Sequence, residues 1–147
     1  MAIQINNLPL PVALMAALES GVWQTPRTPD AWRSLFPHAK ARHAKLYNLK
    51  MMQTENAEWR GQSGPYYLGQ ADEHRPPGDI DSAKSLLIAD LGPDKMIALD
   101  YRESSSRPSV LYITDDPDGS TRWIRVAPDI ETFIRALGLE AVESQTS

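Results

Sequence analysis

Residues 86–137, LLIADLGPDKMIALDYRESSSRPSVLYITDDPDGSTRWIRVAPDIETFIRAL, contain the pattern that decides the fold. The segment opens with the apolar run Leu86, Leu87 and Ile88. In residues 96–102, apolar and polar side chains alternate with the two-residue period of a strand that has one buried face. These features predict two neighbouring strands, separated by the short turn LGPDK at residues 91–95.

Two further strands are expected later in the same segment. Residues 109–114, SVLYIT, are rich in β-forming side chains, and residues 122–126, RWIRV, alternate again. The sequence DDPDGS between them has the aspartate, proline and glycine of a tight turn. Together the four segments predict an antiparallel sheet whose strands are joined by turns.

A helix is predicted to close the segment. Pro128 is expected at its first position, because the missing N–H costs little there. The apolar side chains then recur at i, i+3, i+4 and i+7, and Gly138 ends the helix. These apolar positions are Ile130, Phe133, Ile134 and Leu137.

The N-terminal half reads as helices. Asn7 is expected to cap a helix whose first turn contains Pro9 and Pro11 and which ends at Gly21. Thr28-Pro29-Asp30 predicts the start of a second helix, with Trp32, Leu35 and Phe36 as its apolar stripe.

Further along, residues 46–47 are expected to be extended. Met51, Met52, Glu55 and Trp59 suit a third helix, with Asn48 as its cap. Residues 61–79, GQSGPYYLGQADEHRPPGD, are predicted to form an ordered loop or a brief strand around residues 66–68.

The fold class that follows is α+β, an antiparallel β-sheet flanked by helices, with N-terminal helices followed by the sheet and a C-terminal helix. The 147 residues suit a single domain, with an ordered core at about 8–139 and a flexible tail at 140–147. The chain has no cysteine, no run long and apolar enough to span a membrane and no match to a signal peptide, so a cytoplasmic location is expected.

A search for chemistry nominates no catalytic, cofactor-binding or metal-binding residue. His38 and His43 are five residues apart, which places them on different faces of a helix, and His74 lies in a proline-rich loop. The acidic turn fails as a calcium loop, because aligning Gly119 with the loop glycine puts Thr114 and Arg125 at ligand positions. GQSG at 61–64 is not a nucleophile elbow.

Nucleic acid is not the expected partner, although basic and aromatic residues are interleaved in 27–50. Trp32 and Phe36 sit at helix-stripe positions, which favours the core, and the chain as a whole carries a net charge of −4. The charge is uneven: residues 1–75 have a net charge of +2 and residues 76–147 of −6. Such asymmetry is typical of a solvated surface, and the alternative interpretation is an acidic face that attracts a basic partner.

Several stretches together resemble the SUKH superfamily, which contains a fungal cell-wall assembly regulator and many bacterial immunity proteins. They are LLIADLGP, IALDYR, PSVLY and the run from Trp123 through VAPD into ETFIRAL, with the LPxxLxxxLxSGxW pattern from Leu10 to Trp23 and residues 46–60. The resemblance covers about residues 8–139. It implies an α+β fold without enzyme activity and, for bacterial members, neutralisation of a toxin, often a nuclease, by direct binding.

The leading hypothesis is therefore an intracellular immunity protein whose partner is a protein, a cognate toxin domain. Its candidate contact residues are Asp90, Asp94, Asp115, Asp116 and Asp118. A regulatory or scaffolding protein of the same family with a housekeeping partner is the first alternative. The second is a small-ligand-binding or enzymatic domain that uses the 61–81 loop with Tyr66 and Tyr67. The sequence does not indicate the oligomeric state.

Overall fold

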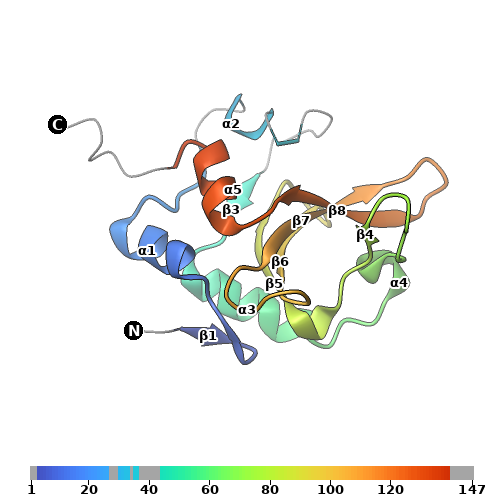
Figure 1. The fold of residues 1–147 in the computed structure, drawn as a ribbon, viewed down its shortest axis with the longest axis horizontal. Coiled ribbons are helices and arrows are strands. Elements are labelled where there is room, and N and C mark those ends of the chain that lie inside the picture. The colour runs from blue at the N-terminus through green and yellow to red at the C-terminus, as the bar shows by residue number, and fades with distance from the viewer. Residues whose placement is uncertain (1–2, 27–29, 34, 37–43, 140–147) are drawn as a thin grey trace.

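The architecture is that of a computed structural model, which describes residues 3–26, 30–33, 35–36 and 44–139. In this part of the chain six strands form one antiparallel sheet (Figure 1). Their order in space is β3 (Lys45–Leu46), β5 (Ser85–Asp90), β6 (Met96–Asp100), β7 (Ser109–Asp115), β8 (Thr121–Ala127) and β4 (Pro77–Gly78).

A small hairpin and five helices surround this sheet within the described residues. The hairpin pairs β1 (Gln4–Ile5) with β2 (Leu8–Pro9). The helices are α1 (Val12–Ser20), α2 (Asp30–Arg33), α3 (Leu49–Trp59), α4 (Pro65–Leu68) and α5 (Ile130–Ala136), and a 3-10 turn, Ser82–Lys84, precedes β5. The fold is α+β with a C-terminal helix, as the sequence predicted.

The central strands are buried on both faces, so the expectation of a half-buried strand at 96–102 was wrong. Ile97, Ala98 and Leu99 of β6 are all fully buried. Consecutive residues of a strand point to opposite faces, and the neighbouring strand β7 is covered on both. On one face the ring of Phe36 packs edge-on against Tyr112, with centroids 4.8 Å apart.

The other face of the sheet is covered by α3, which begins where the sequence predicted. The Asn48 side chain accepts a hydrogen bond from Met51 N at 2.8 Å, the geometry of an N-cap. Trp59 near the end of the helix packs against Trp123 of β8, with centroids 6.1 Å apart. Because Trp123 lies opposite Ile113 in the sheet, α3 covers the face that Phe36 leaves free.

The N-terminus differs from its prediction. Asn6 and Asn7 have φ of 54° and 65° and form the turn of the β1–β2 hairpin, so Asn7 caps no helix. Asparagine tolerates positive φ, which makes an Asn-Asn pair suited to a two-residue hairpin turn. The first helix begins only at Val12, after Pro11, and ends as predicted at Gly21, whose φ is 81°.

Two other local predictions need correction. Residues 66–68 belong to the short helix α4, which has Pro65 at its first turn, and not to a strand. At the C-terminal helix the cap is Asp129, so Pro128 precedes the cap instead of starting the helix. The expected helix start at Thr28-Pro29 and the tail at 140–147 lie outside the described residues.

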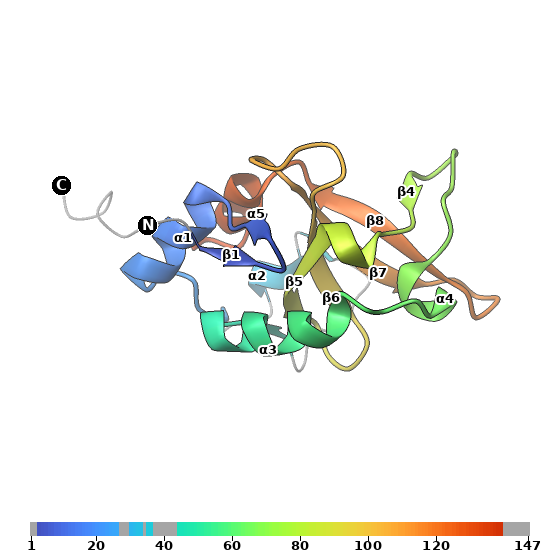
Figure 2. The same cartoon turned by 90° about the horizontal axis from the view of Figure 1, so that it is seen from below.

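The buried apolar side chains form one cluster around the sheet. Ile5 of β1 belongs to this cluster, although the sequence placed the start of the ordered core at about residue 8. The β7–β8 hairpin and α4 lie at one end of the molecule and α1 at the other, as two perpendicular views show (Figures 1 and 2). Of the helices that the structure describes, none combines the length and apolar character needed to cross a bilayer.

Candidate functional site

The turns at residues 91–95 and 116–120 lie at the same end of the sheet. This follows from the register, because Ile97, just after the first turn, pairs with Tyr112, which lies near the end of β7, just before the second turn. The ion pair between Lys95 Nζ and Asp115 Oδ2 joins the first turn to the last residue of β7, directly before the second turn. Sequence-distant aspartates are thereby brought to one surface.

Helix α4 contacts this end of the sheet through the side chains of two tyrosines. Tyr67 Oη donates to Asp94 Oδ1 at 3.1 Å, and this hydrogen bond raises the pKa of the Tyr67 hydroxyl. Tyr66 Oη donates to Asp115 Oδ1 at 3.3 Å. The two rings meet edge to face with centroids 5.1 Å apart, which holds each of them in place.

The β7–β8 turn presents two more carboxylates. Asp116 is paired with the guanidinium of Arg122, which is itself buried. Asp118 Oδ1 accepts from Ser120 Oγ at 2.6 Å and from Ser120 N at 2.9 Å, and these bonds lower the pKa of Asp118. Within the described residues, Asp118 forms no ion pair.

Asp90, the fifth predicted contact residue, is engaged elsewhere. Its Oδ2 accepts from Tyr47 Oη at 2.6 Å, and its Oδ1 accepts from Gly92 N at 3.0 Å. Burial, and then the hydrogen bond to Asp90, raise the pKa of Tyr47. We therefore define the acidic face as Asp94, Asp115, Asp116, Asp118 and Tyr66, and leave Asp90 out of it.

A groove of about 450 Å³ runs beside Tyr66, between residues 69–75 and the turn that leads to Arg122. Its charged lining residues are Asp72, Arg75, Asp116, Asp118 and Arg122. Most of these charges are paired with each other. Asp72 Oδ2 lies 3.3 Å from Arg75 Nε and 3.8 Å from Arg122 Nε, and hydrogen bonds, first from His74 N, lower the pKa of Asp72.

Two glycines allow residues 69–72 to pack against residues 78–79 and so shape the wall of this groove. Gly69 has φ of +67° and Gly78 of +78°, a region that favours glycine. A Cβ added to Gly78 would lie 2.3 Å from the main-chain oxygen of Gln70. The segment continues onto β8, where Trp123 Nε1 donates to Tyr67 O at 2.8 Å.

Sequence reasoning named the aspartates as candidate contact residues, and it named the 61–81 loop only as an alternative site. It missed Arg122, which pairs with Asp116. A signal for this ion pair was available, because Arg122 begins the predicted alternating strand directly after the acidic turn. It also missed that α4 connects the two turns. That connection depends on contacts between residues up to 49 positions apart, which no local pattern reveals.

The described part of the chain supports neither a base-stacking surface at the aromatic residues of 27–50 nor a metal site. The rings of Trp32, Phe36 and Tyr47 are buried, so their predicted core role is confirmed and they are not available to stack on bases. No set of three or more histidine, cysteine, aspartate or glutamate side chains among the described residues is arranged to hold a metal ion. His38 and His43 fall outside those residues.

Comparison with known proteins adds no relative: no family model, no curated protein and no solved structure matches this chain.

Proposed function

We propose that this chain is an intracellular immunity protein, a non-enzymatic binding domain that neutralises a toxin by direct contact through the acidic face. The observation that carries the proposal is the meeting of two acidic turns and an exposed tyrosine at one end of the sheet. The resemblance of the sequence to the SUKH superfamily supplies the biological role.

The charge balance of the face supports a basic partner. Asp115 and Asp116 are in ion pairs with Lys95 and Arg122, whereas Asp94 and Asp118 form no ion pair with the described residues, although the charge of Arg122 contributes to lowering the pKa of Asp118. Toxins that act on nucleic acids need basic clefts, and an uncompensated acidic surface raises the rate at which such a cleft is encountered.

Tyr66 provides the second kind of support. Tyrosine is enriched at protein interfaces because it combines a large apolar area with a polar end and few rotatable bonds. Tyr66 is 41% exposed, although its hydroxyl and its ring both have partners. It is thus a rigid aromatic group surrounded by carboxylates, which suits an interface centre better than a solvated loop.

Affinity capture from the native cell, with the whole chain as bait, tests the proposal. The captured protein is then expressed in a sensitive host with and without this chain. We expect the captured protein to be toxic and the chain to restore growth. Repeated capture of a non-toxic housekeeping protein, or toxicity that the chain does not relieve, would contradict the immunity role.

A further inference from the structure

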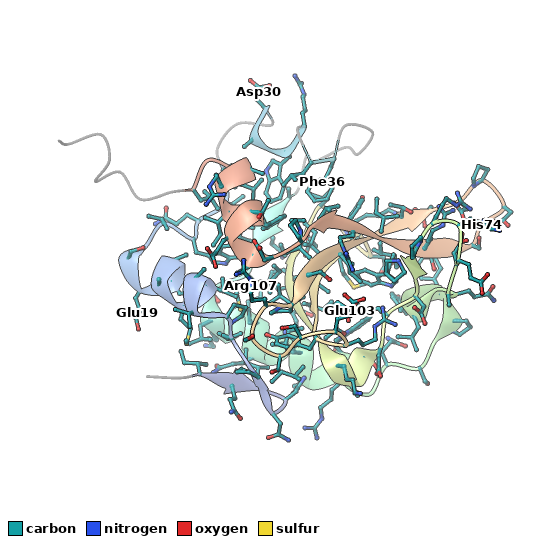
Figure 3. All side chains as sticks on the ribbon, viewed as in Figure 1. Glu19, Asp30, Phe36, His74, Glu103 and Arg107 are labelled. Atoms are coloured by element: carbon teal, nitrogen blue, oxygen red, sulfur yellow. The ribbon has the colours of Figure 1, made fainter. Side chains whose placement is uncertain are left out.

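Resting on this proposed function, we propose that the groove beside Tyr66 receives one long basic side chain, an arginine or a lysine, from the protein partner. The groove opens at the end of the molecule where His74 lies, far from Glu19 of α1 (Figure 3). Its volume of about 450 Å³ falls within the range of roughly 300–1,000 Å³ in which proteins bind small groups.

The arrangement of the carboxylates favours a cation. Asp116 and Asp118 converge on one hydroxyl, because Ser120 Oγ lies 3.4 Å from Asp116 Oδ2 and 2.6 Å from Asp118 Oδ1. Both hydrogen bonds from Ser120 end on the same oxygen of Asp118, Oδ1. A guanidinium or ammonium between the two carboxylates would give Asp118 the ion pair that it does not form with the described residues.

An anionic occupant fits poorly. The groove has three carboxylates and two guanidinium groups, and both guanidinium groups are already engaged. Arg122 is paired with Asp116, and Arg75 with Asp72. An incoming anion would have to break an existing ion pair, whereas an incoming cation can approach Asp118 without breaking one.

Tyr66 accounts for the length of the proposed side chain. The tyrosine stands on the wall of the groove, so the methylene stem of arginine or lysine can lie along the ring while the charged end reaches Asp118. A cation close to an aromatic face gains further attraction from the ring. Because Tyr67 and Asp115 already hold Tyr66, little side-chain freedom is lost on binding.

The test is an NMR titration of the ¹⁵N-labelled full chain with the tripeptide acetyl-glycyl-arginyl-glycine amide. The matched control peptide has norleucine in place of arginine. We expect saturable shift changes at the amides of residues 69–75 and 116–122 with the arginine peptide alone. Changes spread over all surface carboxylates, or equal changes with norleucine, would overturn the proposal.

Three variants of the groove sharpen the test. Asp118→Asn keeps the acceptor for Ser120 but removes the charge, and should weaken binding about threefold, as expected for one solvent-screened ion pair. Tyr66→Phe keeps the ring and should bind nearly as the unmodified chain, whereas Tyr66→Ala should not. Binding that is indifferent to Asp118→Asn and to Tyr66→Ala would also overturn the proposal.

The titration is independent of the toxin experiments. A negative titration with successful growth rescue would reject the groove and leave the immunity role intact. A positive titration with no toxic partner would reject the immunity role and leave a cation-binding groove.

Discussion

The side chain of Asn56 takes the place of a neighbouring strand along the edge of β5, where it binds the main chain of Leu87. Leu87 N donates to Asn56 Oδ1 at 2.7 Å, and Asn56 Nδ2 donates to Leu87 O at 2.9 Å. Strand β3 pairs with β5 through Asp90 and Ala89, and Tyr47 N donates to Ile88 O at 2.8 Å, so these main-chain contacts stop short of Leu87. The carboxamide therefore satisfies edge groups that would otherwise be buried without partners.

Replacing Asn56 with leucine should lower the free energy of unfolding by about 2–4 kcal/mol, because it leaves both main-chain groups of Leu87 unsatisfied in the core. Chemical denaturation measures the loss. Gln53→Leu, the same kind of change on the exposed side of α3, is the control and should change stability by no more than about 0.5 kcal/mol. Equal effects of the two changes would refute this role of Asn56.

Gly78→Ala should destabilise the chain more than Gly119→Ala. Both glycines have positive φ, which costs an alanine about 1–2 kcal/mol, but only at Gly78 would the new Cβ collide with main-chain atoms. We expect the collision to cost about 2 kcal/mol more, as in overpacked sites. Thermal unfolding of the two variants provides the comparison. Similar losses of stability would show that residues 69–79 shift to accommodate the new Cβ at little cost.

The sequence predicted those features that depend on neighbouring residues. The cap at Asn48, the helix end at Gly21 and the 115–120 turn each follow from a few side chains and were found where expected. Asn7 was misplaced because the same residue type suits both a helix cap and a hairpin turn. Only the tertiary pairing of β1 with β2 selects between them.

Features that join distant segments were beyond the sequence. The pattern of β6 could not show that both faces of the sheet are covered, since Phe36 and Trp59 come from elsewhere in the chain. For the candidate site, the aspartates were visible, but their partners were not. Which carboxylates stay uncompensated depends on where Lys95 and Arg122 point.

The stability of α5 should depend on pH through Asp129. Its carboxylate accepts from Thr132 N at 2.8 Å and is 2.8 Å from Arg107 Nη2, and these contacts lower its pKa to about 2. A lowered pKa means that the stabilisation is complete above the ordinary value of 3.8 and is lost as the pH falls toward 2. Urea denaturation between pH 5 and pH 2 follows the loss.

Asp129→Asn is the informative variant, because asparagine keeps the cap but does not titrate. The stability of this variant should fall less steeply between pH 4 and pH 2 than that of the unmodified chain. Asp72 and Asp118, whose pKa values are also lowered, titrate in both proteins, so the difference between the two curves isolates Asp129. Identical curves would assign the acid sensitivity to other carboxylates.

The association rate with the captured partner should depend on Asp94 and Asp118 rather than on the whole acidic turn. Asp115 and Asp116 are in ion pairs, and removing Asp116 would leave the buried Arg122 without its counter-charge. Asp94→Asn with Asp118→Asn removes two charges that form no ion pair with the described residues, and keeps the local geometry. Asparagine tolerates the φ of 60° at residue 94 and can still accept from Tyr67 and Ser120.

We expect this double variant to associate about three- to tenfold more slowly at low salt, and with a weaker salt dependence, because long-range steering is reduced. Stopped-flow measurements at several ionic strengths give both quantities. Glu19→Gln with Glu131→Gln removes the same charge from exposed positions on α1 and α5, and so controls for net charge alone. If both double variants slow association equally, the overall charge steers the partner, and the acidic face is not the contact surface.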